Sequence, residues 1–215
     1  MTDATTARTV SRRWPLISSV TAILLAVALG GIIALRGNTA LELDTEWMDE
    51  ILEHRSPLWE VPSRVMDFLG GGWFAFALPA AGIVVLLIAR RPWSAGYLAL
   101  ASAASAALVQ AIKALYGRPR PTAQLIDLDS GSFPSGHTAN AATLAAVVVL
   151  LFPRVWAWFI AAAWVVLMLL SRTYLGVHWL SDTLGGVLVG VAVAAIVWAP
   201  FAARLQRERT GSVRS

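Results

Sequence analysis

Six stretches of the chain carry no charged residue and consist mainly of alanine, leucine, valine, isoleucine and tryptophan. These stretches extend over residues 14–35, 68–89, 92–112, 138–153, 155–171 and 183–203. Because about 20 apolar residues cross a hydrocarbon core of about 30 Å as a helix, four stretches are long enough to span a bilayer and two are slightly short. The pattern predicts an all-α integral membrane bundle of six transmembrane helices. The first stretch is longer than the apolar core of a signal peptide, so we expect it to remain as a span.

A polar segment over residues 41–69 separates the first two stretches and contains eight acidic residues between Glu42 and Asp67. Its apolar residues recur near helical spacing, which predicts a short amphipathic helix along the outer membrane surface. These residues are Leu58, Val61, Val65, Phe68 and Leu69. A plain connector with a solvated acidic face fits the segment equally well.

Composition supports a membrane protein. Apolar residues make up 57% of the 215 and charged residues only 14%, which is more apolar than a soluble domain of this length requires. Cysteine is absent, which excludes disulfides, thiolate chemistry and thiolate metal sites. The formal charge of +4 comes largely from arginines beside the predicted spans, so it gives no reason to expect nucleic-acid binding.

The distribution of basic residues predicts an orientation. A cytoplasmic N-terminus places ten of the 17 lysines and arginines in the cytoplasm, as the positive-inside rule requires. Both termini are then cytoplasmic, with tails at residues 1–13 and 204–215, and we expect the basic C-terminal tail to be a solvated anchor. No repeat or linker divides the chain, so one transmembrane domain should cover residues 1–215.

Three polar clusters lie where predicted spans begin or end, and alternation of the spans brings all three to the extracytoplasmic face. They are KALYGRPRP at 113–121, PSGH at 134–137, and a third cluster with Ser171, Arg172, His178 and Asp182. Ionisable groups at membrane depth are costly, so their gathering at one depth indicates a functional site. Cations on this face break the positive-inside pattern, which is expected where an anion binds.

The first cluster offers cations in a rigid setting. Pro119 and Pro121 stop the third helix and stiffen its exit, so Lys113 and Arg120 project from a helix end and a constrained loop. Such a pair can clamp a phosphate, with arginine as a planar fork and lysine as a point charge. Snorkelling side chains at a span end would give the same residues.

The second cluster has the residues of a helix N-terminus that binds an anion. Pro134 can open the helix, Ser135 offers a hydroxyl donor, and Gly136 lets a ligand approach the backbone. His137 would stand beside the anion as a proton carrier, since its ordinary pKa lies near neutrality. An ordinary N-cap followed by a packed histidine is the alternative.

The third cluster contains a histidine and a carboxylate four residues apart. His178 and Asp182 share one helix face, so a carboxylate oxygen can hold one imidazole N–H and leave the other nitrogen as a nucleophile. Arg172 can reach the same anion after the turn through Gly176. A buried ion pair that locks two helices together is the alternative.

Together the clusters resemble the three-part signature of the type 2 phosphatidic acid phosphatase superfamily. The matching residues are Lys113, Arg120 and Pro121, then Pro134 to His137, then Ser171, Arg172, His178 and Asp182. The family spacing from Lys113 selects Arg120 over Arg118, which is left to assist binding or to face lipid headgroups.

The resemblance implies roles for these residues. His178 is the expected nucleophile that becomes phosphohistidine, Asp182 orients it, and His137 is the expected general acid. The groups expected to hold the phosphoryl oxygens are Lys113, Arg120, Ser135, Gly136 and Arg172. No metal or other cofactor is implied, and Asp127 and Asp129 in the loop show no metal-ligand spacing.

These expectations describe a metal-independent lipid phosphatase of the cell membrane with an extracytoplasmic site. Its expected partners are the bilayer and a lipid phosphate, either undecaprenyl diphosphate or a phosphatidate or phosphatidylglycerol phosphate; the sequence gives no oligomeric state. A transporter that uses the cationic cluster only to bind an anion or a lipid is the alternative function. Such a protein would usually carry polar residues through its spans or an inverted repeat, whereas here they gather at one face.

Overall fold

The computed structural model describes residues 13–128 and 130–211, and all regular elements within them are α-helices. They are α1 (Arg13–Leu35), α2 (Glu42–Glu53), α3 (Pro57–Gly70), α4 (Phe74–Ile88), α5 (Pro92–Tyr116), α6 (Gly136–Leu151), α7 (Val155–Tyr174) and α8 (Leu180–Gly211). The predicted N-terminal tail, apart from Arg13, and the last four residues of the C-terminal tail lie outside the described residues. The predicted all-α class is confirmed for the part of the chain that is described.

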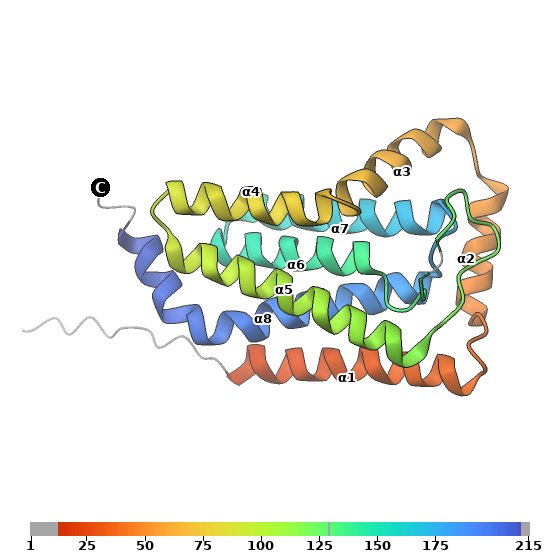
Figure 1. The fold of residues 1–215 in the computed structure, drawn as a ribbon, viewed down its shortest axis with the longest axis horizontal. Helices are drawn as coiled ribbons and strands as arrows, with labels where there is room; N and C mark the ends of the chain where they lie inside the picture. Colours follow the sequence, from red (N-terminus) through yellow and green to blue (C-terminus); the bar gives the residue numbers. More distant parts are fainter. Residues whose placement is uncertain (1–12, 129, 212–215) are drawn as a thin grey trace, which may run out of the picture.

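Four helices are long and apolar enough to cross a bilayer, namely α1, α5, α7 and α8. α3 and α4 pass the same test together, as one span bent by 60°. α6 is apolar but has only 16 residues. Figure 1 shows α1 and α4 to α8 running along one common direction, while α2 crosses one end of the bundle. The structure thus supports four or five spans by length, and a count of six stays a prediction.

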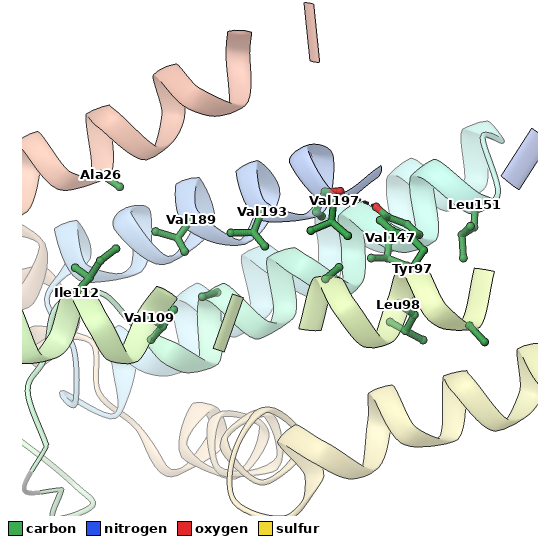
Figure 2. Packing of buried hydrophobic residues seen from close by; sticks show 14 of the residues in the cluster. Ala26, Tyr97, Leu98, Val109, Ile112, Val147, Leu151, Val189, Val193 and Val197 are labelled. Carbon is green, nitrogen blue, oxygen red and sulfur yellow. Dashed lines mark hydrogen bonds between the residues drawn. The ribbon is translucent and has the colours of Figure 1, made fainter. Parts of the chain in front are cut away.

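Helix α8 lies at the centre of the packing, against α1, α5 and α6. Glycines let α6 approach it closely: a Cβ on Gly190 would lie 2.3 Å from the carbonyl oxygen of Ala139. Small residues serve this purpose in membrane bundles, where apolar lipid gives no hydrophobic drive for helices to associate. Figure 2 shows Val189 and Val193 of α8 beside Val109 of α5 in the apolar core. This packing fixes the relative depth of the helix ends that carry the polar clusters.

Two glycines with positive φ shape the loops at the end where α2 crosses. Gly117 ends α5 in the left-handed conformation at φ 54°, and its N–H donates to the Lys113 carbonyl. Gly176, at φ 67°, follows α7, and a Cβ there would lie 2.4 Å from the carbonyl oxygen of Ala123. The α7–α8 turn therefore packs directly on the loop that follows α5. This contact brings the first and third polar clusters together.

The acidic segment 41–69 folds into two helices, α2 and α3. The apolar side chains predicted to lie on one face are exposed on α3, with Leu58 76% and Val61 66% accessible. Asp44 of α2 turns inward and is completely buried. The position of α3 against a membrane surface stays a prediction. Most acidic residues of the segment are exposed, but it is more than a solvated connector because Asp44 is buried inside the protein.

Residues 204–211 of the expected C-terminal tail continue α8, and most of the described side chains there are exposed, but Arg204 and Glu208 contact the start of α5. Leu205 is buried, and the guanidinium of Arg204 lies 3.8 Å from the ring centroid of Trp93. The Glu208 carboxylate accepts from the backbone N–H groups of Trp93 and Ser94 at 2.6 and 2.9 Å. A carboxylate is favourable at those free N–H groups and at the positive end of the α5 dipole, which explains why the helix extends this far.

Candidate active site

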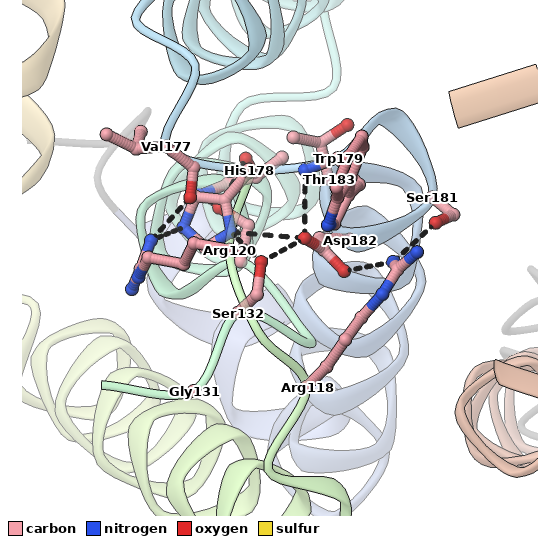
Figure 3. Close-up of polar contacts among 12 residues, drawn as sticks. Arg118, Arg120, Gly131, Ser132, Val177, His178, Trp179, Ser181, Asp182 and Thr183 are labelled. Atoms are coloured by element: carbon pink, nitrogen blue, oxygen red, sulfur yellow. Dashed lines mark hydrogen bonds and ion pairs between the residues drawn. The ribbon is translucent and has the colours of Figure 1, made fainter. Parts of the chain in front are cut away.

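His178 lies in the turn between α7 and α8, with its two ring nitrogens in different surroundings. Nε2 lies 3.2 Å from Nη1 of Arg120, which also donates to the Val177 carbonyl at 2.6 Å. Nδ1 lies 3.6 Å from Oδ2 of Asp182 and 3.4 Å from Oγ of Ser132. Figure 3 shows the imidazole between Arg120 on one side and Asp182 on the other. The predicted His–carboxylate pair therefore exists, at ion-pair distance, but the predicted shared helix face is wrong, because α8 begins only at Leu180.

Ser132 links the two members of this pair. Its hydroxyl donates to Oδ2 of Asp182, and its Oγ is placed to accept from Nδ1–H of His178. The same carboxylate oxygen accepts from the backbone N–H of Trp179 at 2.9 Å. Sequence reasoning gave Ser132 no role, although it stands two residues before Pro134. With Nδ1 facing Ser132, the unprotonated nitrogen of a neutral imidazole is Nε2.

Burial controls the charge of the groups around His178. Burial lowers the pKa of His178 to about 3, because Asp182 only partly offsets the cost of a buried imidazolium. Burial also lowers the pKa of Arg120, and the nearby positive charge of Arg172 lowers it further. Arginine nevertheless stays protonated in proteins. The site therefore pairs a neutral imidazole with a guanidinium.

Arg118 holds Asp182 from the side opposite His178. Its Nη1 donates to Oδ1 of Asp182 at 2.6 Å and its Nη2 to Oδ2 of Asp44 at 2.7 Å. Asp44 also accepts from the backbone N–H and the hydroxyl of Ser181, both at 2.8 Å. The side chains of Arg118, Asp44 and Asp182 are fully buried. The alternative that Arg118 faces lipid headgroups is therefore wrong, because its side chain is buried and pairs with two carboxylates, while assistance in binding stays a prediction.

Lys113 and Arg120 meet at the loop before α6. The ammonium group of Lys113 donates to the Gly131 carbonyl, while Arg120 donates from Nε to the Ser130 carbonyl at 2.9 Å. The two predicted phosphate-binding cations thus come together on one loop. The same loop carries Ser132 to the His178 pair.

His137 and Arg172 share a carboxylate that sequence reasoning did not select. Oδ1 of Asp67, on α3, accepts from Nη1 of Arg172 and lies 3.2 Å from Nε2 of His137. The Asp67 backbone carbonyl is also 3.2 Å from that nitrogen. Nε and Nη2 of Arg172 are buried, and neither has a hydrogen-bond partner within the described part of the chain. Because a buried polar group without a partner is costly, these two nitrogens point to a missing ligand.

Ser135 and Gly136 begin α6 at the same end of the bundle. The Ser135 hydroxyl accepts from the backbone N–H of Thr138 at 3.4 Å, and its own N–H donates to the Asp182 carbonyl at 2.9 Å. In this structure the Ser135 hydroxyl is an N-cap, which was the alternative in the sequence, and its phosphate-binding role stays a prediction. The backbone bond ties the start of α6 to the first turn of α8.

A cavity of about 590 Å³ extends from His137 between α4, α5 and α6. Its lining is mostly apolar or small, with Phe76, Pro79 and Ile83 from α4 and Ala106 and Val109 from α5. The polar end at His137 and the apolar walls along the helices suit a molecule with an anionic head and a hydrocarbon chain.

Comparison with known proteins places the chain among membrane phosphatases. The family model "PAP2 superfamily" matches residues 94–205. Phosphatidylglycerophosphatase B of Bacillus subtilis is 31% identical over 138 residues, which cover 59% of this chain and 68% of the relative. An undecaprenyl-diphosphatase of Sulfolobus acidocaldarius is 36% identical over 83 residues, which cover 39% of this chain and 36% of the relative.

The fold is also similar to a solved structure. The crystal structure of a transmembrane PAP2-type phosphatidylglycerolphosphate phosphatase from Bacillus subtilis aligns with a TM-score of 0.75 at 26% sequence identity. The alignment covers 87% of this chain and 96% of that one. Together with the long apolar helices, this similarity identifies a multi-pass membrane protein.

Proposed function

The chain belongs to the PAP2 superfamily, and from that membership we propose that it hydrolyses a membrane lipid phosphate through a phosphohistidine on His178. The observation that carries the mechanism is the setting of this imidazole. Nδ1 faces the hydroxyl of Ser132, which is hydrogen-bonded to Asp182, and we call these two residues the Ser132–Asp182 relay. Nε2 lies 3.2 Å from Nη1 of Arg120. A neutral imidazole held in this way presents Nε2 to an anion bound by the guanidinium.

The reaction then proceeds in two steps. Nε2 of His178 attacks phosphorus, the bond from phosphorus to the lipid oxygen breaks, and that oxygen leaves with a proton from His137. A water molecule next attacks the phosphohistidine and gives its proton to His137, while the N–P bond breaks and phosphate is released. Asp182 stabilises the positive charge that develops on the His178 ring. His137 loses a proton in the first step and regains one in the second.

The phosphoryl oxygens are held by the cations of the site. Arg172 can offer Nε and Nη2 as a fork, since both are buried without a partner in the described chain. Arg120 and Lys113 supply two further positive charges, and Ser135 and Gly136 supply the start of helix α6. Positioning and charge stabilisation of this kind provide most of the catalysis in phosphoryl transfer.

The membrane arrangement is part of the same proposal. We infer six spans, with both termini in the cytoplasm and the polar end of the bundle at the extracytoplasmic face. At about 1.5 Å per residue, a 16-residue helix such as α6 covers about 24 Å, less than the hydrocarbon core of about 30 Å. His137 at its start would then lie slightly below the outer interface, at the depth of a lipid phosphate. The cavity along α4 and α5 would take part of the lipid chain.

The proposed substrates are phosphatidylglycerol phosphate or phosphatidate, and undecaprenyl diphosphate. The names of the relatives support both classes, since one is a phosphatidylglycerophosphatase and another an undecaprenyl-diphosphatase. An extracytoplasmic site suits undecaprenyl diphosphate, which is released on that side of the membrane by cell-wall synthesis. Initial rates of the purified full chain on these three lipids, with a chelator present, would rank them.

The mechanism is tested by comparing the full chain with His178→Ala. We expect phosphate release from a short-chain phosphatidate to vanish in His178→Ala, and vanadate, which mimics the five-coordinate phosphoryl group, to inhibit the unsubstituted protein. His54→Ala is the matched control, because the His54 side chain is exposed at the end of α2 and, among the described residues, pairs only with Glu50. Phosphate release that persists in His178→Ala, or insensitivity to vanadate, would contradict attack by His178. No release from any of the three lipids would favour the transport alternative.

A further inference from the structure

The carboxylate of Asp67 connects two groups of the site that lie on different helices. It pairs with Arg172 of α7 and with His137 of α6, while Asp67 itself belongs to α3. Its side chain is 28% exposed and that of His137 is 20% exposed, whereas Arg172 is completely buried. Asp67 therefore lies at the border between the interior and the open side of the site.

Backbone packing holds Asp67 in this place. The hydroxyl of Ser171, next to Arg172, donates to the Ser63 carbonyl of α3 at 2.7 Å. The end of α3 is so close to the imidazole that a Cβ on Gly71 would lie 2.1 Å from Nε2 of His137. α3 is thus a packed wall of the site, and Asp67 is part of that wall.

The pairing with Arg172 leaves room for a second anion. Nη1 of Arg172 donates to the Asp67 carboxylate. Nε and Nη2 lie on the other edge of the guanidinium, where they are buried and have no hydrogen-bond partner in the described chain. A carboxylate that merely replaced a phosphate would be expected to occupy the open fork. In the observed geometry Asp67 instead orients the guanidinium through Nη1 and leaves Nε and Nη2 available to a ligand.

The charges around His137 give Asp67 a second effect. The charged groups that face this imidazole are Asp67 from α3 and Arg172 from α7. A nearby carboxylate favours the protonated imidazole and a nearby guanidinium disfavours it. Asp67 thus offsets Arg172, so that a cation required for phosphate binding can stand beside a histidine that must carry a proton.

We propose that Asp67 is a positioning residue of the phosphatase site, which orients Arg172 toward the phosphoryl oxygens and strengthens proton binding by His137, the general acid. The assignment rests on the proposed function, since it needs His137 as a proton donor. The Nε2–H of His137 stays with Asp67, and Nδ1–H is the proton given to the lipid oxygen. This arrangement gives the second histidine of the site its own carboxylate.

The test is Asp67→Asn in the purified full chain, with kcat and KM for a short-chain phosphatidate measured between pH 5 and pH 9. We expect kcat at pH 8 to fall at least about 10-fold and its alkaline limb to move to lower pH by about one unit, because loss of a close opposite charge weakens proton binding by that order. Asp67→Glu, which restores the charge, should recover part of the alkaline limb. In a His137→Gln background, Asp67→Asn should shift the limb no further.

Glu60→Gln is the matched control, since it removes a carboxylate from the same helix that pairs only with the exposed Arg64 among the described residues. If the unsubstituted protein releases no phosphate, the proposed function fails. If it is active and Asp67→Asn keeps its pH profile, the present assignment is overturned, even where the melting temperature falls. A lower KM with tighter vanadate inhibition and unchanged kcat would also overturn it, because Asp67 would then be an anion that substrate displaces.

Discussion

The two histidine–aspartate pairs of the site differ in how the chain builds them. His178 and Asp182 are four residues apart, and both side chains are almost fully buried. His137 and Asp67 are 70 residues apart, on separate helices, and both remain partly exposed. A nucleophile must attack from one fixed direction, whereas an acid must also give up and regain a proton from water. The buried pair suits the first task and the open pair suits the second.

The number of groups that support each carboxylate differs as well. Asp182 has Ser132, the Trp179 N–H and Arg118 around it, and Arg118 is held in turn by Asp44. Asp67 has Arg172, which is itself an expected substrate ligand, and the imidazole of His137, which is the expected general acid. The position of Asp182 is therefore fixed by many contacts, while that of Asp67 depends on a group that substrate also engages.

The largest expected effect comes from breaking the buried pair with Asp182→Asn. The amide removes the charge that stabilises the phosphohistidine cation and can hold the wrong tautomer, so kcat should fall by about 10³- to 10⁴-fold, as for other buried acid–histidine pairs. Steady-state phosphate release measures this loss. It should exceed the loss in Asp67→Asn, and equal losses would contradict the division of roles between the two pairs.

Arg118→Met should cause the next largest effect, on stability. The change leaves Asp44 and Asp182 buried without their shared cation, and breaking a buried ion pair in this way costs about 3–5 kcal/mol. The midpoint of thermal unfolding in detergent should fall accordingly. Arg64→Met is the control, because its i,i+4 pair with Glu60 is exposed and contributes at most about 1 kcal/mol. An equal change in both variants would mean that Arg118 does not hold the site together.

Ser132→Ala should sharpen the comparison with a smaller effect. It removes the hydroxyl between His178 and Asp182, and one lost hydrogen bond of about 1–1.5 kcal/mol corresponds to roughly a 10-fold lower kcat. KM should change little, since Ser132 faces the imidazole pair. Ser18→Ala on exposed α1 is the control. If kcat of Ser132→Ala equals that of the control, the Ser132 hydroxyl does not contribute to catalysis.

The smallest expected effect is that of lowering the pH on the reaction rate. Because burial lowers the pKa of His178 to about 3, its imidazole stays neutral down to that pH, well below the ordinary value of 6.5. The rate of phosphohistidine formation, corrected for titration of the substrate and of His137, should therefore change less than about 2-fold between pH 7 and pH 5. A decline centred near pH 6.5 would show an imidazole that titrates as if exposed.

The sequence predicted much of the fold because the bilayer requires long apolar helices. The six apolar stretches of the sequence are mostly helical in the structure, although residues 71–73 of the second stretch form a break between α3 and α4, and the family resemblance is confirmed. The close spacing of His178 and Asp182 correctly predicted that they pair, but the predicted shared helix face is wrong, because His178 lies in the turn before α8. The catalytic and phosphate-binding roles of the motif residues stay predictions.

The sequence could not place the groups that act across the fold. Asp44 and Asp67 lie in an acidic segment whose spacing matches no local pattern, and Arg118 differs from Arg120 only in the direction in which its loop carries it. The sequence places Glu208 in a solvated tail, whereas in the structure its carboxylate accepts from the first backbone N–H groups of α5. Local periodicity determined which segments are helices and which residues pair within one turn. Only the packing of α2, α3 and α8 decided which buried charges meet, because those contacts join residues about 60 to 140 positions apart.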